Sequence, residues 1–176
     1  MDLTICKSLP EDAIPFTDCV INCWQSAYKG IVPDESLGNM LAAREQLIEK
    51  YSRVFTNPGD CVYYYVMYNE KMVGFLIINK NRDGNMPGIG EIWAIYLMDE
   101  FCGKGYGKKL LDFEVNELKR LGCRQIYLWV LEENGRARRF YEKHGFRFTG
   151  TVREVSRYGA QLIQVEYVLE EATYGK

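Results

Sequence analysis

The segment from Phe101 to Leu111 constrains the fold most, because three alternating glycines run directly into an amphipathic helix after an apolar strand. These glycines are Gly103, Gly105 and Gly107. Glycine has no Cβ, so the backbone there can adopt positive φ and come close to a ligand. The unpaired N–H groups and the positive dipole end of the helix favour an anion, and Lys104, Lys108 and Lys109 add positive charge. The segment therefore predicts a phosphate-binding loop, with a plain tight turn as the alternative.

Two common phosphate-binding loops do not fit this segment. A Walker loop that begins at Gly103 needs glycine at position 108 and Ser or Thr at 110, where the chain has Lys108 and Leu110. A dinucleotide fingerprint from the same glycine also needs glycine at 108, and it normally opens the first strand–helix–strand unit. Here the loop lies past the middle of the chain. Neither a P-loop nor a dinucleotide-binding fingerprint is therefore predicted.

One domain spanning residues 1–176 is predicted, since a chain of 176 residues can bury roughly 70% of the surface that its unfolded form exposes. The formal net charge of −2 argues against nucleic acid or an acidic membrane as the main partner. No apolar stretch reaches the roughly 18 residues that a transmembrane helix needs, and residues 1–7 do not resemble a signal peptide. We expect a soluble, cytoplasmic protein with reduced thiols.

The cysteines and the histidine argue against a metal site. The six cysteines include no Cys-x-x-Cys pair, and His144 is the single histidine. A structural zinc site needs about four such ligands at short spacings. We therefore expect no bound metal.

Hydrophobic periodicity predicts an alternation of strands and helices. Helices are expected at about 10–29, 33–54, 104–121 and 135–143, and strands at 3–7, 61–68, 72–80, 91–98, 125–131, 146–155 and 161–169. Residues 81–90, with three glycines and a proline, are expected to form a loop. In the helix from 104, apolar residues occupy one face and Lys and Glu the other. This order predicts one α/β domain with a mixed sheet.

Four features between residues 91 and 146 keep a specific order. Glu91 begins a strand, the glycine loop opens a helix, Asn134 precedes a short helix, and residues 140–146 read Phe-Tyr-Glu-Lys-His-Gly-Phe. This pattern resembles the GCN-type N-acetyltransferase (GNAT) superfamily, which moves an acyl group from coenzyme A to an amine. The resemblance implies a single-domain α/β fold whose central sheet has about seven mostly antiparallel strands and a splayed central pair, flanked by about four helices.

The resemblance also implies a binding site for acetyl-coenzyme A. Backbone N–H groups of the loop would hold the pyrophosphate, Ile95 and Leu97 would offer backbone groups to the thioester and pantetheine, and Asn134 would hydrogen-bond the pantetheine arm. The loop residues concerned are Cys102, Gly103, Lys104, Gly105, Tyr106, Gly107 and Lys108. Cys102 stands where the family usually has Gln or Arg, so one long polar side chain is missing. A thiol near Lys104 is predicted to ionise easily, with a small turn-filling residue as the alternative.

Two residues match positions that carry proton transfer in the family. Tyr141 matches the general acid, since a phenol can donate a proton to the leaving thiolate at neutral pH. The alternative is a core aromatic on an amphipathic helix. Glu91 lies at the spacing where some members carry the general base, which would take a proton from the attacking ammonium. A solvated carboxylate is the alternative there, and other members pass this proton along waters.

The resemblance implies an enzyme that acetylates a primary amine of a small molecule or peptide. Direct attack is expected, because no Cys or Ser is placed as an acyl carrier. The resemblance places the wall facing the acceptor at about residues 24–37 and 153–159. A coenzyme-binding sensor without turnover is the rival within the fold, and a nucleotide-binding protein is the rival outside it. Neither the acceptor nor the oligomeric state follows from the sequence, and a homodimer stays open.

Overall fold

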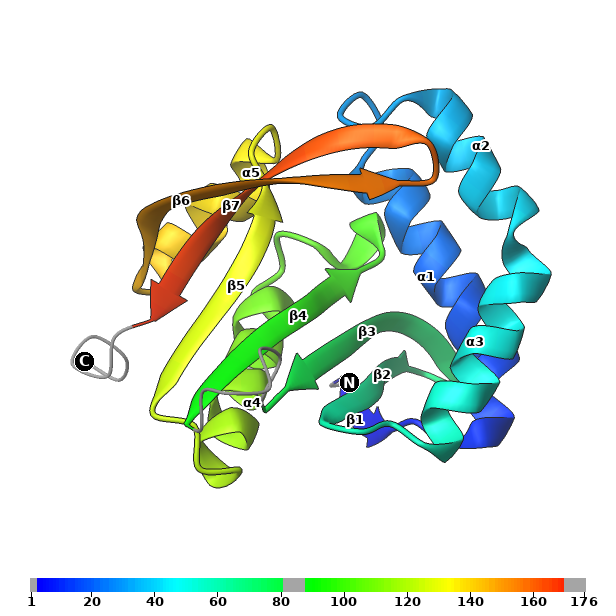
Figure 1. The fold of residues 1–176 in the computed structure, drawn as a ribbon. Helices are drawn as coiled ribbons and strands as arrows, with labels where there is room; N and C mark the ends of the chain where they lie inside the picture. The colour runs from blue at the N-terminus through cyan, green and yellow to red at the C-terminus, as the bar shows by residue number, and fades with distance from the viewer. Residues whose placement is uncertain (1–2, 81–87, 170–176) are drawn as a thin grey trace.

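The computed structural model describes residues 3–80 and 88–169, which form a seven-stranded sheet flanked by helices (Figure 1). The sheet order is β1-β2-β3-β4-β5-β7-β6, and every neighbouring pair is antiparallel except β4 and β5. The strands are β1 (Thr4–Lys7), β2 (Cys61–Tyr68), β3 (Lys71–Asn79), β4 (Ile89–Leu97), β5 (Gln125–Leu131), β6 (Phe146–Arg157) and β7 (Ala160–Leu169). The expected α/β class and mostly antiparallel mixed sheet are confirmed.

The described residues contain five α-helices and two short 3-10 turns. The helices are α1 (Ala13–Ala27), α2 (Asp34–Ala42), α3 (Arg44–Thr56), α4 (Tyr106–Arg120) and α5 (Gly135–Lys143), and the turns are η1 (Pro10–Asp12) and η2 (Asp99–Phe101). Within this part of the chain no helix has the length and apolar character needed to cross a membrane.

Two expected boundaries are wrong. The single helix expected at 33–54 is two helices, because Ala43 leaves the helical conformation (φ −83°, ψ 13°). The chain turns there, and the Arg44 guanidinium pairs with the Asp18 carboxylate of α1 at 2.7 and 3.0 Å. The strand expected from residue 91 begins at Ile89, which pairs with Gln125 of β5. The rest of the loop expected at 81–90 falls at 81–87, outside the described residues.

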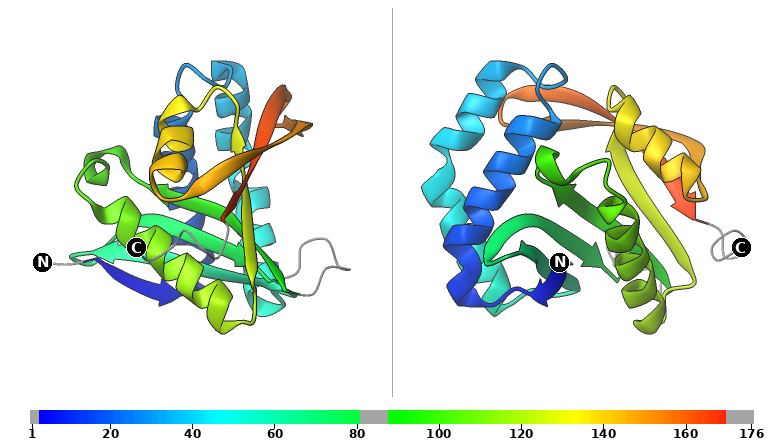
Figure 2. Two further views of the ribbon diagram at one scale, coloured as in Figure 1. Left: turned by 90° about the vertical axis from the view of Figure 1, so that its left-hand side faces the viewer. Right: turned by 180° about the vertical axis from the view of Figure 1, so that it is seen from behind.

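Helices cover both faces of the sheet, and each face has its own apolar core. On one face, Phe16 of α1 makes ring contacts with Tyr51 and Phe55 of α3 and with Phe75 of β3. The other core lies beneath α4 and α5, which Figure 2 shows in front of the sheet when it is seen from behind. Its fully buried members include Leu76, Ile78, Leu110, Leu111, Leu118, Leu128 and Tyr167.

The parallel pair at the centre of the sheet separates part of the way along. Register between β4 and β5 ends at Ile92 and Leu128. Trp93 is an extra residue at a bulge against β3, since Ile77 faces Ala94 while Ile78 faces Ile92. Bulges bend a strand and increase its twist, which turns the end of β4 away from β5. This fork, confirming the splayed pair, opens beneath the β6–β7 hairpin in Figure 1.

Candidate active site

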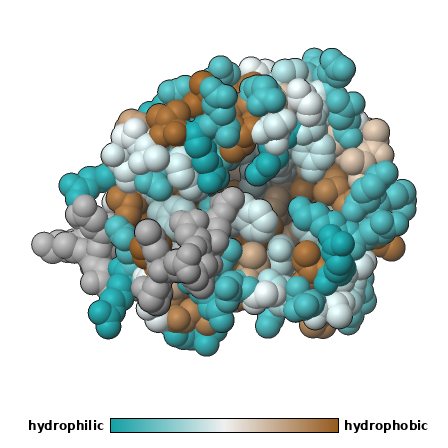
Figure 3. Space-filling model, viewed as in Figure 1, coloured by the Kyte–Doolittle hydropathy of each residue, from teal (hydrophilic) through white to brown (hydrophobic). Residues whose placement is uncertain are grey.

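A cleft of about 510 Å³ occupies the fork between β4 and β5. Its walls come from the ends of both strands, the segment after β4, the end of α1 and one face of α5. The space-filling view in Figure 3 shows a hollow between the end of β4, α1 and the β6–β7 hairpin. The fork therefore leaves an open space at the centre of the molecule, as a substrate site requires.

The glycine loop, for which a phosphate cradle is predicted, lies at the edge of this cleft. Gly103 and Gly105 have φ of 75° and 82°, and Gly105 is the N-cap of α4. Apart from the adjacent residues of the chain, no heavy atom lies within 4 Å of the position that a Cβ would take at either glycine. Both glycines line the cleft, so the space beside the free helix N–H groups is open to a ligand.

Gly107 allows close helix packing and does not have the positive φ of the other two glycines. It lies in the first turn of α4, and a Cβ there would stand 3.3 Å from Cε2 of Phe140. The missing Cβ therefore lets α4 approach α5 closely. Tyr106, the first residue of α4, and Lys104, whose Nζ lies 5.8 Å from the Phe101 ring, are not among the described residues that line the cleft.

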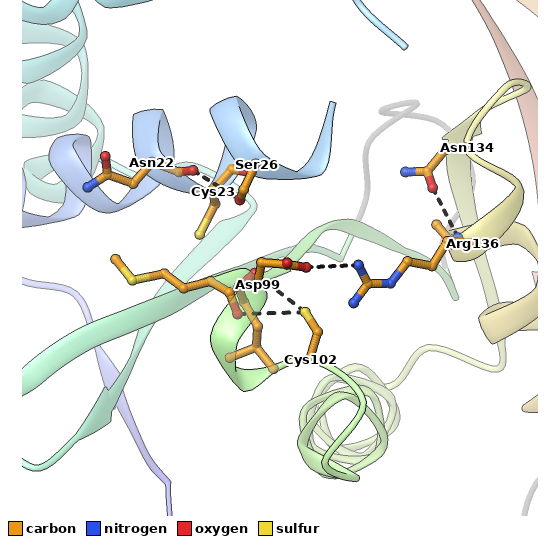
Figure 4. A network of polar contacts seen from close by, with 10 residues as sticks. Asn22, Cys23, Ser26, Asp99, Cys102, Asn134 and Arg136 are labelled. Carbon is orange, nitrogen blue, oxygen red and sulfur yellow. Dashed lines mark hydrogen bonds and ion pairs between the residues drawn. The ribbon is translucent and has the colours of Figure 1, made fainter. Parts of the chain in front are cut away.

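Basic side chains gather around the cleft. Lys108 lines it and forms an ion pair with Asp112 at 2.6 Å. Arg136 of α5 reaches across to Asp99 of η2, with Nη1 and Oδ1 3.0 Å apart (Figure 4). Lys143 and His144 lie on the same lining, where burial and the neighbouring lysines lower the pKa of His144. The sequence indicated the lysines of the loop, but only the fold brings α5 beside them.

The prediction that Cys102 ionises easily is wrong. Cys102 follows η2 and lies before α4, half-buried, with its Sγ 3.8 and 3.7 Å from the carbonyl oxygens of Leu97 and Met98. Burial raises the pKa of its thiol, an effect that Asp99 reinforces and Arg136 opposes. The thiol therefore behaves as a turn-filling group on the cleft wall.

Three other predicted binding residues lie on the cleft. Ile95 and Leu97 line it from β4, along the stretch that no longer pairs with β5. Asn134 lines it from the start of α5, where its Oδ1 accepts a hydrogen bond from the Ala137 N–H at 3.1 Å. This cap occupies one end of the Asn134 amide and leaves the Nδ2 end for a ligand.

Tyr141 lies at the meeting point of these walls. Its side chain faces the cleft from α5 although the residue is only 8% exposed. Burial raises the pKa of Tyr141 well above that of a free phenol, and the nearby groups of Glu114 and Tyr28 raise it further. Tyr141 therefore holds its proton at neutral pH, as a general acid must.

Two tyrosines also line the cleft: Tyr28, within the segment expected to face the acceptor, and Tyr96, which sequence reasoning missed. Their phenol oxygens form a hydrogen bond that joins the end of α1 to β4. Burial raises the pKa of both groups, so both are neutral at physiological pH. Neither tyrosine carried a sequence signal, since one follows a helix and the other lies in an apolar strand.

Glu91 is buried in β4 and lies away from the lining of the cleft. It is 1% exposed and faces Asn79 and Tyr127 in the registers with β3 and β5. It is not among the described cleft-lining residues, which begin at Ile92 on this strand. Proton transfer between Glu91 and a substrate would therefore need a water between them.

The two segments expected to face the acceptor lie together. Trp24 and Tyr158 make an edge-to-face ring contact at 5.8 Å, and the Asn39 amide donates to the Tyr158 carbonyl at 3.2 Å. Val32 and Leu37 pack with residues of β5 and β7. The helical α1–α2 region and the β6–β7 turn thus form one wall beside the cleft.

Glu114 lies on the opposite face of α4 from the one that we expected. We expected the glutamates of this helix on its solvent face, but Glu114 is fully buried among the apolar residues on the inner face of α4. It follows Leu110 by four residues and Leu111 by three, and it precedes Leu118 by four. That spacing placed it on the apolar face and could have identified it.

Coenzyme A fits the residues present. The open positions beside Gly103 and Gly105 leave room for a phosphate against the helix N-terminus, and Lys108 and Arg136 supply opposite charge. The separated strands leave room for a long chain between them. Within residues 3–80 and 88–169, no group of His, Cys, Asp and Glu could hold a metal ion.

The fold is shared with solved structures of N-acetyltransferases, one of them in complex with coenzyme A. The family model described as "Acetyltransferase (GNAT) family" matches residues 24–146, more than half of the chain. The chain therefore belongs to the GNAT family, as its sequence motifs predicted.

Relatives and solved structures agree with this assignment. The Spermine/spermidine N(1)-acetyltransferase of Bacillus subtilis is 32% identical over 118 residues, which cover 58% of this chain and 72% of the relative. The Spermidine N(1)-acetyltransferase of Thermoplasma acidophilum is 25% identical over 86% of this chain and 92% of its own length. The fold also superposes on a crystal structure of the PaiA N-acetyltransferase from Thermoplasma acidophilum in complex with coenzyme A, with a TM-score of 0.72 and 22% identity. The match covers 97% of this chain and 99% of the PaiA chain.

Proposed function

We propose that the protein transfers the acetyl group of acetyl-coenzyme A to a primary amine of a small molecule or peptide, by direct attack in a ternary complex. The observation that carries this proposal is the position of Tyr141, a buried phenol that faces the fork between the glycine cradle and the acceptor wall. Polyamines are the first acceptors to test, because two relatives are named for spermine or spermidine.

The lining of the cleft supports the proposed binding roles. N–H groups of residues 102–108 would hold the pyrophosphate, with Lys108 supplying charge. Ile95 and Leu97 would offer backbone groups to the pantetheine and thioester, and the free end of the Asn134 amide would donate to the same arm. Bound acetyl-coenzyme A supplies the activated acyl group.

Burial of the two side chains supports the proposed proton roles. Tyr141 would donate its phenol proton to the departing sulfur, since its raised pKa keeps that proton at neutral pH. The amine must lose a proton before it attacks. Glu91, buried and away from the cleft lining, would accept this proton through a water, and transfer to solvent is the alternative.

The test is an acceptor screen with thiol release as readout, followed by Tyr141→Phe with the best acceptor. We expect kcat to fall on the order of 100-fold with little change in coenzyme affinity. Tyr64→Phe is the matched control, because Tyr64 is also 8% exposed but bonds to Glu117 at 3.1 Å away from the cleft lining. Full activity in Tyr141→Phe would remove the acid role, and coenzyme binding without thiol release from any amine would favour a sensor.

A further inference from the structure

One ion pair joins the two sides of the fork at the edge of the cleft. Nη1 of Arg136 in α5 donates to Oδ1 of Asp99 in the turn η2 at 3.0 Å (Figure 4). Because η2 follows β4 and α5 follows β5, the pair links the segments that continue the two separated strands. Both residues line the cleft together with Gly103 and Gly105 of the cradle. A ligand that enters the cradle along the fork therefore meets this pair.

The pair is held loosely. Its two side chains are 64% and 70% exposed, and the contact joins one guanidinium nitrogen to one carboxylate oxygen. Exposed ion pairs of this kind stabilise a protein very little, because water screens the charges and both side chains lose freedom. A guanidinium binds a phosphate more strongly, since its planar fork can donate two parallel hydrogen bonds to the phosphate oxygens. The Asp99 carboxylate is thus a partner that a coenzyme phosphate can displace.

The position of Arg136 in its helix is an independent indication of an anion. Arg136 is the second residue of α5, and the first turn of this helix contains no acidic residue. A cation there is unfavourable, because the positive end of the helix dipole lies at the N-terminus, whereas an anion is stabilised. The caps of both helices, Gly105 of α4 and Asn134 of α5, line the same cleft. Two helix N-termini and an arginine therefore favour a strongly negative ligand.

We propose that Arg136 is a coenzyme-binding residue that leaves Asp99 and binds the pyrophosphate when the coenzyme enters the cradle. Asp99 and the pyrophosphate compete for one guanidinium, so the ion pair lowers the affinity for the coenzyme and forms again when coenzyme A leaves. The pyrophosphate is the expected partner, because Arg136 lines the same cleft as the glycines of the cradle. The inference rests on the coenzyme-binding part of the proposed function and does not depend on transfer to an amine.

Calorimetric titration with coenzyme A tests the exchange. Arg136→Gln should weaken binding about tenfold or more, because a charged hydrogen-bond donor to the pyrophosphate is lost. Asp99→Asn should tighten binding about twofold to fivefold, because a weak exposed pair no longer competes. Glu100→Gln is the matched control, since Glu100 lies in the same turn and pairs with Lys71 at 3.0 Å, but is not among the described residues that line the cleft. This control should leave the affinity unchanged.

A double-mutant cycle separates competition for Arg136 from simple charge repulsion by Asp99. In the Arg136→Gln protein, Asp99→Asn should have no further effect on coenzyme affinity, because the guanidinium is gone. Unchanged or weaker binding in Asp99→Asn alone, or an equal gain in both backgrounds, would overturn the exchange.

Dephospho-coenzyme A identifies the phosphate, because it keeps the pyrophosphate and lacks the 3′-phosphate. Arg136→Gln should weaken the binding of this ligand as much as that of coenzyme A. A loss that disappears with dephospho-coenzyme A would assign the arginine to the 3′-phosphate and overturn the proposed contact.

These binding results are separate from turnover. A wild type that shows them but releases no thiol with any amine would refute the proposed transferase and leave the exchange intact. Turnover combined with coenzyme affinities that neither substitution changes would refute the exchange and leave the transferase.

Discussion

The pH dependence of folding should reveal the buried carboxyl of Glu114 directly. Its folded-state pKa is raised well above the ordinary value of 4.5 because the side chain is completely buried. Between those two pKa values the folded protein holds a proton that the unfolded chain has released. The contribution of Glu114 to stability is therefore complete below pH 4.5 and is lost as the pH rises toward the raised pKa.

The size of the effect follows from linkage. One extra proton bound in the folded state lowers the free energy of unfolding by about 1.4 kcal/mol for each pH unit. Replacing Glu114 by Gln removes this term and leaves the other titrating groups in place. His144 acts in the opposite direction in the acid range, since its pKa is lowered, but it is present in both proteins and cancels in the difference.

Urea unfolding followed by tryptophan fluorescence, from pH 5.5 to 7.5, measures the difference. The stability of the wild type relative to Glu114→Gln should fall by about 1.4 kcal/mol per pH unit until the raised pKa is reached. Glu114→Leu should be more stable than the wild type at pH 7.5 by about 1–3 kcal/mol, because an unpaired buried polar group is removed. Parallel stability curves for the wild type and Glu114→Gln would refute the reasoning.

Three further predictions concern the cleft. Gly105→Val should weaken coenzyme binding on the order of tenfold or more by filling the cradle. Gly122→Val is the control, because Gly122 has a similar positive φ at the far end of α4, and it should leave binding unchanged. Equal coenzyme affinities of the two variants in calorimetry would argue against the cradle. Glu91→Gln should lower kcat/KM near neutral pH and recover part of it at high pH, and a uniform small loss would indicate transfer to solvent instead. Cys102 should react slowly with iodoacetamide at pH 7 and faster as the pH rises, because burial raises the pKa of its thiol; rapid labelling at pH 7, seen by mass spectrometry, would contradict this.

The sequence predicted what depends on local pattern. The strands, the cradle and the short helix of Tyr141 all follow from periodicity and glycine spacing, and the structure has them. The break at Ala43 could not be seen, because it accompanies an ion pair between Arg44 and Asp18, which are 26 residues apart. The Tyr28–Tyr96 contact joins residues 68 apart and likewise has no local signal.

Glu114 was misplaced for a different reason. Its spacing to Leu110 and Leu118 put it on the buried face of α4, but the usual preference of glutamate for solvent outweighed that pattern. A polar residue within an apolar stripe breaks the local hydrophobic pattern, and such conflicts indicate candidate functional sites.

With acetyl-coenzyme A bound along it as proposed, the fork would also tie the lifetime of the folded protein to its supply of substrate. Past Ile92, the edge of β4 that faces β5 has no strand partner, so the sheet contains an internal gap in its own hydrogen bonding. A ligand lying along this gap binds only the folded chain, and at 100 times its Kd it stabilises the fold by about 2.7 kcal/mol. A cell short of acetyl-coenzyme A would therefore hold a more easily unfolded and more easily degraded enzyme.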